Sequence, residues 1–191
     1  MQLIFRKRSC PNIIGKNAFF YHTIVMRQIN LLIIHCSATK ENHPFTLQAL
    51  DASHRKRGFN GIGYHYYIRQ SGEVINTRPL SRIGAHAKGY NRNSIGICYE
   101  GGLDKDGKPK DTRTPEQRAA LCQLVYELLT RFPESKVCGH RDLSPDLNHN
   151  GKIEPHEWNK QCPCFDVASD IVKLGETSVN TEVSHGESVS Q

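Results

Sequence analysis

Residues 31–36 read LLIIHC, an apolar run that ends on a histidine and a cysteine. Four successive aliphatic side chains predict a buried strand, which we extend from Ile29 to Cys36. Because side chains alternate along a strand, His35 points to the opposite face from Ile34 and Cys36. The run therefore predicts a core behind the strand and a histidine that faces a pocket in front of it.

Strands and helices alternate along the chain on the C-terminal side of this run. Further strands are expected at residues 64–69, 73–76, 94–100 and 136–139, and helices at residues 46–57, from Thr114 onward and at residues 166–174. The helix at Thr114 has the clearest start, because Thr114 is an N-cap, Pro115 suits the first helical position and Gln117 closes a capping box. The alternation predicts an α/β fold, a single domain with a central mixed β-sheet flanked by helices.

Length and composition set the domain boundaries. The chain has 191 residues, of which 37% are hydrophobic, and this suits one domain, placed at residues 29–175. Residues 1–28 show no clean period and are expected to be an optional extension, with Met26 as a candidate natural start. Residues 176–191 are rich in Ser, Glu, Thr and Val without a period, so we expect a disordered tail.

Charge and hydropathy bear on the partner and the compartment. The net charge of +6 and the pI near 9.0 favour an anionic partner, although the scattered Lys and Arg equally suit solubility. Residues 15–17 (GKN) interrupt the N-terminal apolar residues, so we expect synthesis in the cytoplasm without a Sec signal. No run approaches the roughly 20 apolar residues of a membrane span. We expect a monomer that binds no nucleic acid.

Three residues, His35, His140 and Cys162, are candidate metal ligands. His140 follows an apolar strand as His35 does, and Cys162 lies in the segment KQCPC at residues 160–164. Each of them alone is more often a structural residue. Together, two imidazoles and one thiolate could bind zinc and leave a fourth position for water. If the three residues meet, the site is that of a hydrolase.

Six short motifs occur in one order along the chain. They are residues 34–39 (IHCSAT), 63–66 (GYHY), 84–91 (GAHAKGYN), 93–96 (NSIG), 139–142 (GHRD) and 160–163 (KQCP). Each motif is weak alone, whereas the ordered set is specific. Over residues 29–174 it resembles the zinc-dependent N-acetylmuramoyl-L-alanine amidases, the type that includes amidase-type phage lysozymes and peptidoglycan recognition proteins.

The resemblance implies a reaction, a partner and a set of roles. It implies hydrolysis of the amide between N-acetylmuramic acid and L-alanine in peptidoglycan, by a protein that acts on the cell wall after release or delivery. The zinc ligands would be His35, His140 and Cys162, the catalytic pair Tyr64 and Lys160, and the substrate contacts His86 and Asn93. An extended backbone would put Lys160 on the same face as Cys162. His65 points away from Tyr64 and is expected to be structural or to contact the site residues from behind.

The segment between His140 and Cys162 contains a second motif. Residues 146–157 fit an EF-hand loop, with Gly151 at the sharp turn. The expected Ca²⁺ ligands are the side chains of Asp146, Asn148, Asn150 and Glu157 and the carbonyl of Lys152. Bound calcium would rigidify the loop that carries Lys160 and Cys162. The alternative is a surface turn rich in Asn and Gly.

Three other functions compete with the amidase. Cys138, His140, Cys162 and Cys164 could form a closed structural zinc site, which would leave His35 unused. A peptidoglycan-binding module without catalysis is the second alternative, although such modules commonly lack the cysteine that is present here at position 162. Nucleic-acid binding is the weakest, because only the basic pI suggests it.

Overall fold

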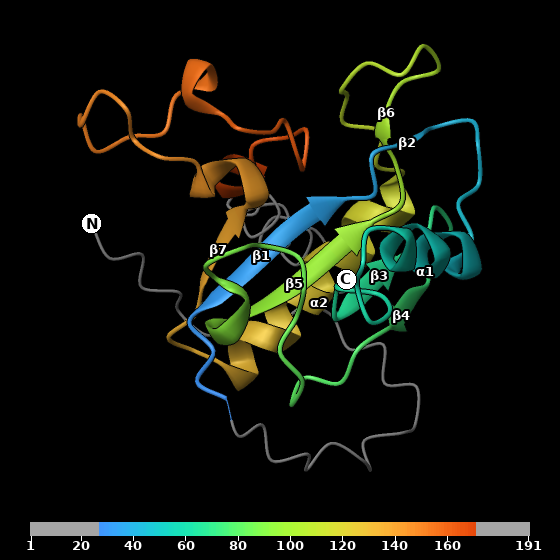
Figure 1. Cartoon of the computed structure of the whole chain (residues 1–191), viewed down its shortest axis with the longest axis horizontal. Coiled ribbons are helices and arrows are strands. Elements are labelled where there is room, and N and C mark those ends of the chain that lie inside the picture. The colour runs from blue at the N-terminus through green and yellow to red at the C-terminus, as the bar shows by residue number, and fades with distance from the viewer. Residues whose placement is uncertain (1–26, 171–191) are drawn as a thin grey trace, which may run out of the picture.

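The computed structural model describes residues 27–170, which surround a central five-stranded sheet (Figure 1). The sheet has the order β4-β3-β5-β1-β7, and its strands are β1 (Leu31–Cys36), β3 (Tyr66–Ile68), β4 (Val74–Asn76), β5 (Ser94–Tyr99) and β7 (Lys136–Gly139). β1 pairs in parallel with β5 and β7, and β3 pairs in parallel with β5 and antiparallel with β4. The predicted mixed sheet is confirmed.

The two long helices cover opposite faces of this sheet. α2 (Pro115–Arg131) packs its apolar stripe against the face that carries Ile34 and Cys36. α1 (Leu47–Lys56) packs on the other face, where its Leu50 joins Tyr67 and Cys98. His35 is paired in register with Cys98, and alternation along β1 puts its side chain on the α1 face. The predicted core lies behind His35, and the cavity described below lies in front of it.

Local sequence fixes where both helices begin. The Thr46 hydroxyl accepts a hydrogen bond from the N–H of Ala49 and caps α1. At α2, the Thr114 hydroxyl accepts from the N–H of Gln117, while the Gln117 side chain accepts from the N–H of Thr114. The capping box predicted for α2 is therefore present, with Pro115 at the first position of the helix.

Two parts of the fold differ from the expectation. A second, two-stranded parallel sheet joins β2 (Thr39–Lys40) and β6 (Gly102–Leu103), which are too short to show a hydrophobic period. Strand β3 begins at Tyr66, so the hairpin expected from Tyr64 is shorter than predicted. Tyr64 therefore precedes the strand instead of starting it.

Irregular segments at the ends of β5 and β7 bring the remaining motifs to the sheet. These segments contain the short 3-10 helices η1 (Asn91–Asn93), η2 (His140–Leu143) and η3 (Pro155–Glu157). Helix η2 starts directly after β7, where the Asp142 carboxylate accepts the N–H of Gly139 at 2.7 Å. His140 therefore lies just past the end of β7, next to the C-terminal end of β1.

A buried arginine fastens the segment that follows Cys162. The Arg113 side chain is fully buried, and it donates to Asp111 at 2.9 Å and to Asp170 at 2.7 Å. Its guanidinium carbon lies 3.2 Å from the centre of the Phe165 ring. A buried cation is tolerated here because both carboxylates pair with it.

Several predictions fall outside the described residues. They concern most of the N-terminal extension, Met26, the C-terminal tail and the last residues of the helix expected at 166–174. Arg27 belongs to the predicted extension but contacts the domain, since it donates to the carbonyls of Leu80 and Arg92. Within residues 27–170, no helix is both long enough and apolar enough to cross a membrane.

Candidate active site

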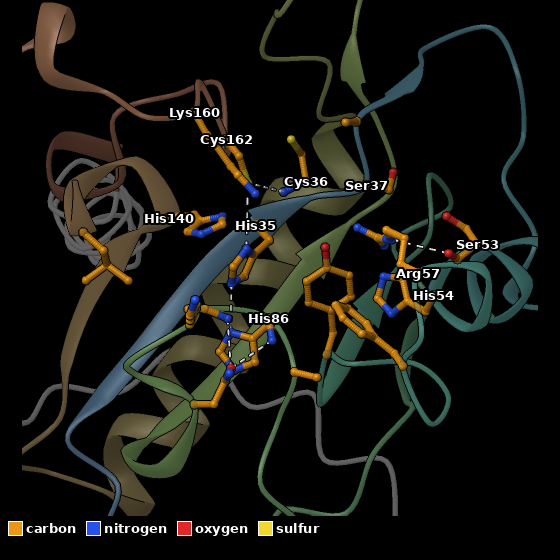
Figure 2. Close-up of a pocket in the computed structure, with 18 of the residues that line it drawn as sticks. His35, Cys36, Ser37, Ser53, His54, Arg57, His86, His140, Lys160 and Cys162 are labelled. Carbon is orange, nitrogen blue, oxygen red and sulfur yellow. Dashed lines mark hydrogen bonds between the residues drawn. The ribbon is translucent and has the colours of Figure 1, made fainter.

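A cavity of about 710 Å³ opens in front of β1, on the face of the sheet covered by α1. Its walls come from the end of β1, from α1 and the segment after it, from the loop before β5, and from the loops that carry His140 and Cys162. Figure 2 shows these side chains converging from elements that are far apart in the sequence. The cavity is therefore built by the tertiary fold.

The three candidate ligands meet in this cavity. One ligand atom each from His35, His140 and Cys162 lies within 4.8 Å of the other two. Nδ1 of His35 is 3.9 Å from Sγ of Cys162, and the rings of His35 and His140 are 4.6 Å apart between centres. Two imidazoles and one thiol are a donor set that suits zinc, so the residues present fit this metal.

Backbone hydrogen bonds hold the ligand loops together. The N–H of Cys36 donates to Sγ of Cys162 at 3.3 Å, and the N–H of Arg141 donates to the carbonyl of Cys162 at 2.8 Å. Gly139 is close to Pro163, since a Cβ at position 139 would lie 2.7 Å from the proline ring. The positions of Cys162 and His140 are thereby coupled to the end of β1.

Burial keeps both histidines of the cluster neutral. Burial, with smaller effects from His86, His140 and Lys160, lowers the pKa of His35 well below its usual value. Burial and the nearby Lys160 charge lower the pKa of His140 to about 4. Metal binding requires the neutral imidazole, so both histidines are in their binding form at neutral pH.

Tyr64 and Lys160 reach the same cavity. The Tyr64 ring lies between His35 and His54, at 5.1 and 5.2 Å between ring centres. Burial raises the pKa of the Tyr64 phenol well above 10, so the hydroxyl keeps its proton at neutral pH. The loop of Cys162 brings Lys160 to the cavity (Figure 2), where its charge acts on both His35 and His140.

The two predicted substrate contacts, His86 and Asn93, have different positions. His86 lines the cavity, but its Nδ1 lies 3.0 Å from Nε2 of His35. Asn93 is not among the cavity-lining residues, and its amide donates to the carbonyl of Gln28 at 2.9 Å. Substrate contact by Asn93 therefore stays a prediction. Asn91 lines the cavity instead.

The segment 53–59 supplies cavity residues that the sequence did not single out. They are Ser53, His54, Arg57 and Phe59. His54 follows Leu50 by four residues, which puts both on one face of α1, and this spacing is the signal by which the sequence could have shown that His54 faces inward. Its Nδ1 accepts the N–H of Gly63 at 2.9 Å, and burial lowers its pKa to about 4.

His65 is structural as expected, because its Nδ1 accepts the N–H of Gly96 at 3.0 Å.

The geometry favours the open metal site over the closed one. Within residues 27–170, neither Cys138 nor Cys164 joins a group of three or more candidate ligands. The Cys164 thiol instead donates to the carbonyl of Gly102 at 3.2 Å and lies 3.9 Å from the Cys36 sulfur. Burial raises the pKa of the Cys138 thiol to about 12, which opposes the thiolate form that zinc needs. His35, which the closed site leaves unused, belongs to the observed cluster.

The EF-hand-like loop is closed by its own hydrogen bonds. The Asp146 carboxylate accepts the N–H of Gly151 at 2.7 Å, and Gly151 has a φ of 80°, which a side chain would strain. The Glu157 carboxylate accepts from the N–H groups of Leu147 and Glu154, both at 2.8 Å. Oδ1 of Asn148 accepts the N–H of Asn150, and Oδ1 of Asn150 accepts that of Lys152. These bonds give the loop a defined shape, and calcium binding to it stays a prediction.

Calcium is expected to stabilise the zinc-loaded protein. At about a hundredfold excess over its dissociation constant, a ligand of the folded state adds roughly 2.7 kcal/mol. For a chain of this size we expect Tm to rise by about 5–10 °C in a thermal melt. Glu157→Gln, which keeps the shape but removes the bidentate carboxylate, should abolish the rise. An unchanged Tm of the parent protein over a full calcium titration would show that the loop is only a surface turn.

Comparisons with known proteins agree on one family. A family model described as N-acetylmuramoyl-L-alanine amidase matches residues 25–164. An endolysin of Enterobacteria phage K11 is 34% identical over 150 residues, which are 78% of this chain and 89% of the endolysin. A protein of Haemophilus influenzae with no described function is 51% identical over 98 residues, 51% of this chain and 84% of that protein.

A solved structure has the same fold. The N-acetylmuramoyl-L-alanine amidase LysC from Clostridium intestinale superposes with a TM-score of 0.60 at 28% sequence identity. The match covers 78% of this chain and 87% of the LysC chain. The predicted likeness in fold is therefore confirmed.

Proposed function

The chain belongs to the N-acetylmuramoyl-L-alanine amidase family, and on this premise we propose that it is a zinc-dependent peptidoglycan amidase. It hydrolyses the amide that joins the lactyl group of N-acetylmuramic acid to L-alanine of the stem peptide. The observation that carries the proposal is the meeting of His35, His140 and Cys162 in one cavity, with Tyr64 and Lys160 beside them.

The cluster would hold one zinc ion through two imidazoles and one thiolate. When bound, zinc supplies Lewis-acid polarisation of the scissile carbonyl and makes water a stronger nucleophile. Burial of His35 and His140 prepares the site, because both rings are neutral before metal arrives. The protein thus contributes a preformed cluster in which both imidazoles are already neutral.

Lys160 stabilises negative charge on the substrate. Its side chain lines the cavity, and its positive charge contributes to the lowered pKa of both histidines of the cluster, so we place it next to the scissile amide. The carbonyl oxygen of that amide becomes negative as water adds to its carbon. A cation that lines the cavity lowers the energy of this oxyanion more than it lowers that of the neutral amide. Lys160 therefore acts on the transition state.

Tyr64 orients the reacting groups through its hydroxyl. Because burial keeps the phenol protonated, Tyr64 donates a hydrogen bond and does not act as a general base at neutral pH. The departing amino group of L-alanine needs a proton, and the Tyr64 hydroxyl and the Lys160 ammonium are the proton carriers that we place next to it. Packing between His35 and His54 fixes the ring that carries this hydroxyl.

Charge along the cavity suits an anionic peptide. Arg57, Lys88 and Lys160 line its walls, and the whole chain carries a net charge of +6. Free carboxylates of a stem peptide are attracted by such a lining.

The phage relative is called an endolysin. In keeping with it, we propose that this protein is made in the cytoplasm and acts on the wall after release or delivery.

Digestion of purified peptidoglycan tests the proposed function. The zinc-loaded protein is expected to release new amino termini that are L-alanine, which labelling of free amines followed by hydrolysis identifies. The parent protein treated with a chelator is the matched control and should release none. Binding to the wall material without new L-alanine termini would instead identify a non-catalytic module, and cleavage at another bond would show a different hydrolase.

A further inference from the structure

The two ring nitrogens of His35 face different partners. Nδ1 lies 3.9 Å from Sγ of Cys162, on the side of the ligand cluster. Nε2 lies 3.0 Å from Nδ1 of His86, on the opposite side of the ring (Figure 2). His35 itself is only 1% exposed, so water cannot replace either partner freely. The metal-facing nitrogen of His35 is therefore Nδ1, and the other nitrogen is committed to His86.

We infer that His86 is a positioning residue that accepts the Nε2–H of His35 and thereby frees Nδ1 of His35 to bind zinc. The inference rests on the proposed function, since it assigns a residue to the same metal site. In this role His86 acts through His35 and does not bind the metal itself. The substrate contact expected for His86 from the sequence stays a separate prediction, since His86 also lines the cavity.

The number of protons on the two rings supports a hydrogen bond in which His35 donates and His86 accepts. A neutral imidazole carries one N–H, so in the His35–His86 contact one ring donates and the other accepts. If His86 donated, the single proton of His35 would sit on Nδ1 and block the nitrogen that faces Cys162. If His35 donates, the proton of His86 sits on Nε2, which lies 3.4 Å from the Ser94 hydroxyl. Only the second arrangement leaves a lone pair toward the ligand cluster.

The fold holds the His86 ring in a narrow slot. A Cβ at Gly84 would lie 2.5 Å from the ring, and a Cβ at Gly96 would lie 2.6 Å from it. The backbone N–H groups of His86 and Ala87 both donate to the Asn91 side chain at 2.9 Å. Two glycines and one amide therefore fix both the ring and its backbone. This degree of constraint is what a group that sets the orientation of a ligand requires.

The expected loss of zinc affinity on removal of His86 can be taken from the behaviour of other zinc sites. A histidine ligand usually donates its free N–H to an acceptor, and loss of that acceptor weakens metal binding by about 10–100-fold. Here the acceptor is a second neutral imidazole instead of a carboxylate or a carbonyl. An apolar ring in its place would leave the buried Nε2–H of His35 without a partner.

Two substitutions at position 86 separate the hydrogen bond from the packing. His86→Phe keeps a ring but removes the acceptor, and we expect its zinc dissociation constant to rise by about 10–100-fold in competition with a chelator of known affinity. His86→Asn places an amide oxygen near the former Nδ1 and is expected to stay within about threefold of the parent protein. His65→Asn is the control, because His65 packs against His86 but lies outside the His35 contact. It should bind zinc as the parent does.

The outcomes separate this inference from the proposed function. Equal zinc affinity of His86→Phe and the parent, or equal losses in His86→Phe and His86→Asn, would overturn the positioning role. If neither variant folds, long-range ¹H–¹⁵N spectra of the zinc-loaded parent decide: His35 should be protonated at Nε2 and metal-bound at Nδ1, and the reverse pattern would overturn the role. A parent that binds zinc in this way but releases no L-alanine termini would refute only the proposed function. A parent without zinc binding would refute both.

Discussion

Cys162→Ser is expected to lose zinc and amidase activity together. Serine is nearly isosteric with cysteine, but its hydroxyl is a far poorer zinc ligand than a thiolate. The loss in zinc affinity should exceed the roughly 100-fold that removal of an outer partner can cost. Activity should fall to the level of the chelator-treated parent. Zinc content after dialysis and release of L-alanine amino termini measure the two effects on the same sample.

Two other cysteines serve as matched controls for this variant. Cys164→Ser lies two residues away, and its hydroxyl can still donate to the carbonyl of Gly102, as the thiol does. Cys138→Ser lies on β7, next to the loop of His140. Both should keep zinc, because neither belongs to the cluster of three ligands. Loss of zinc in either control, as in Cys162→Ser, would favour the closed structural site, in which Cys138 and Cys164 are ligands, and remove the basis for catalysis.

Lys160→Ala is expected to separate metal binding from catalysis. The side chain supplies charge and no metal ligand, so the variant should keep one zinc ion per chain. Removal of one preorganised donor to an oxyanion typically lowers kcat by about 10²–10³, and we expect a loss in this range. The measurement is the rate of amine release from purified peptidoglycan at saturating zinc.

A second lysine controls for the lost charge. Lys152→Ala removes a positive charge from the same long loop but leaves the Lys152 backbone carbonyl in place, and its side chain is exposed. It should digest peptidoglycan at the parent rate. A parent-like rate in Lys160→Ala would show that its ammonium does not stabilise the transition state, although the zinc site could still be correct.

The parts of the fold that were predictable are those that local sequence determines. The short apolar run of β1 favours a buried strand, and the capping box at Thr114 marks the start of α2 by local sequence alone. The two-residue strands β2 and β6 depend on each other across the fold, and neither has a period of its own. Sequence alone therefore could not reveal the second sheet.

The sequence likewise predicted only part of the candidate site. His35, His140 and Cys162 were found because their motifs occur in a recognisable order, and the fold does bring them together. Asn93 was named as a substrate contact from its motif alone. No local pattern shows that residues 91–93 form a 3-10 helix, or that Asn91 lines the cavity. The direction of the His86 ring depends on a slot between Gly84 and Gly96, two positions that no local pattern relates to each other.

The most direct test of the central claim is a zinc titration of the metal-free protein on purified peptidoglycan. The rate of release of L-alanine amino termini is followed as zinc is added. We expect no release without metal, a rise in proportion to added zinc, and a plateau at one zinc ion per chain. Full release by protein shown to contain no metal, or no release at one equivalent of bound zinc, would contradict it.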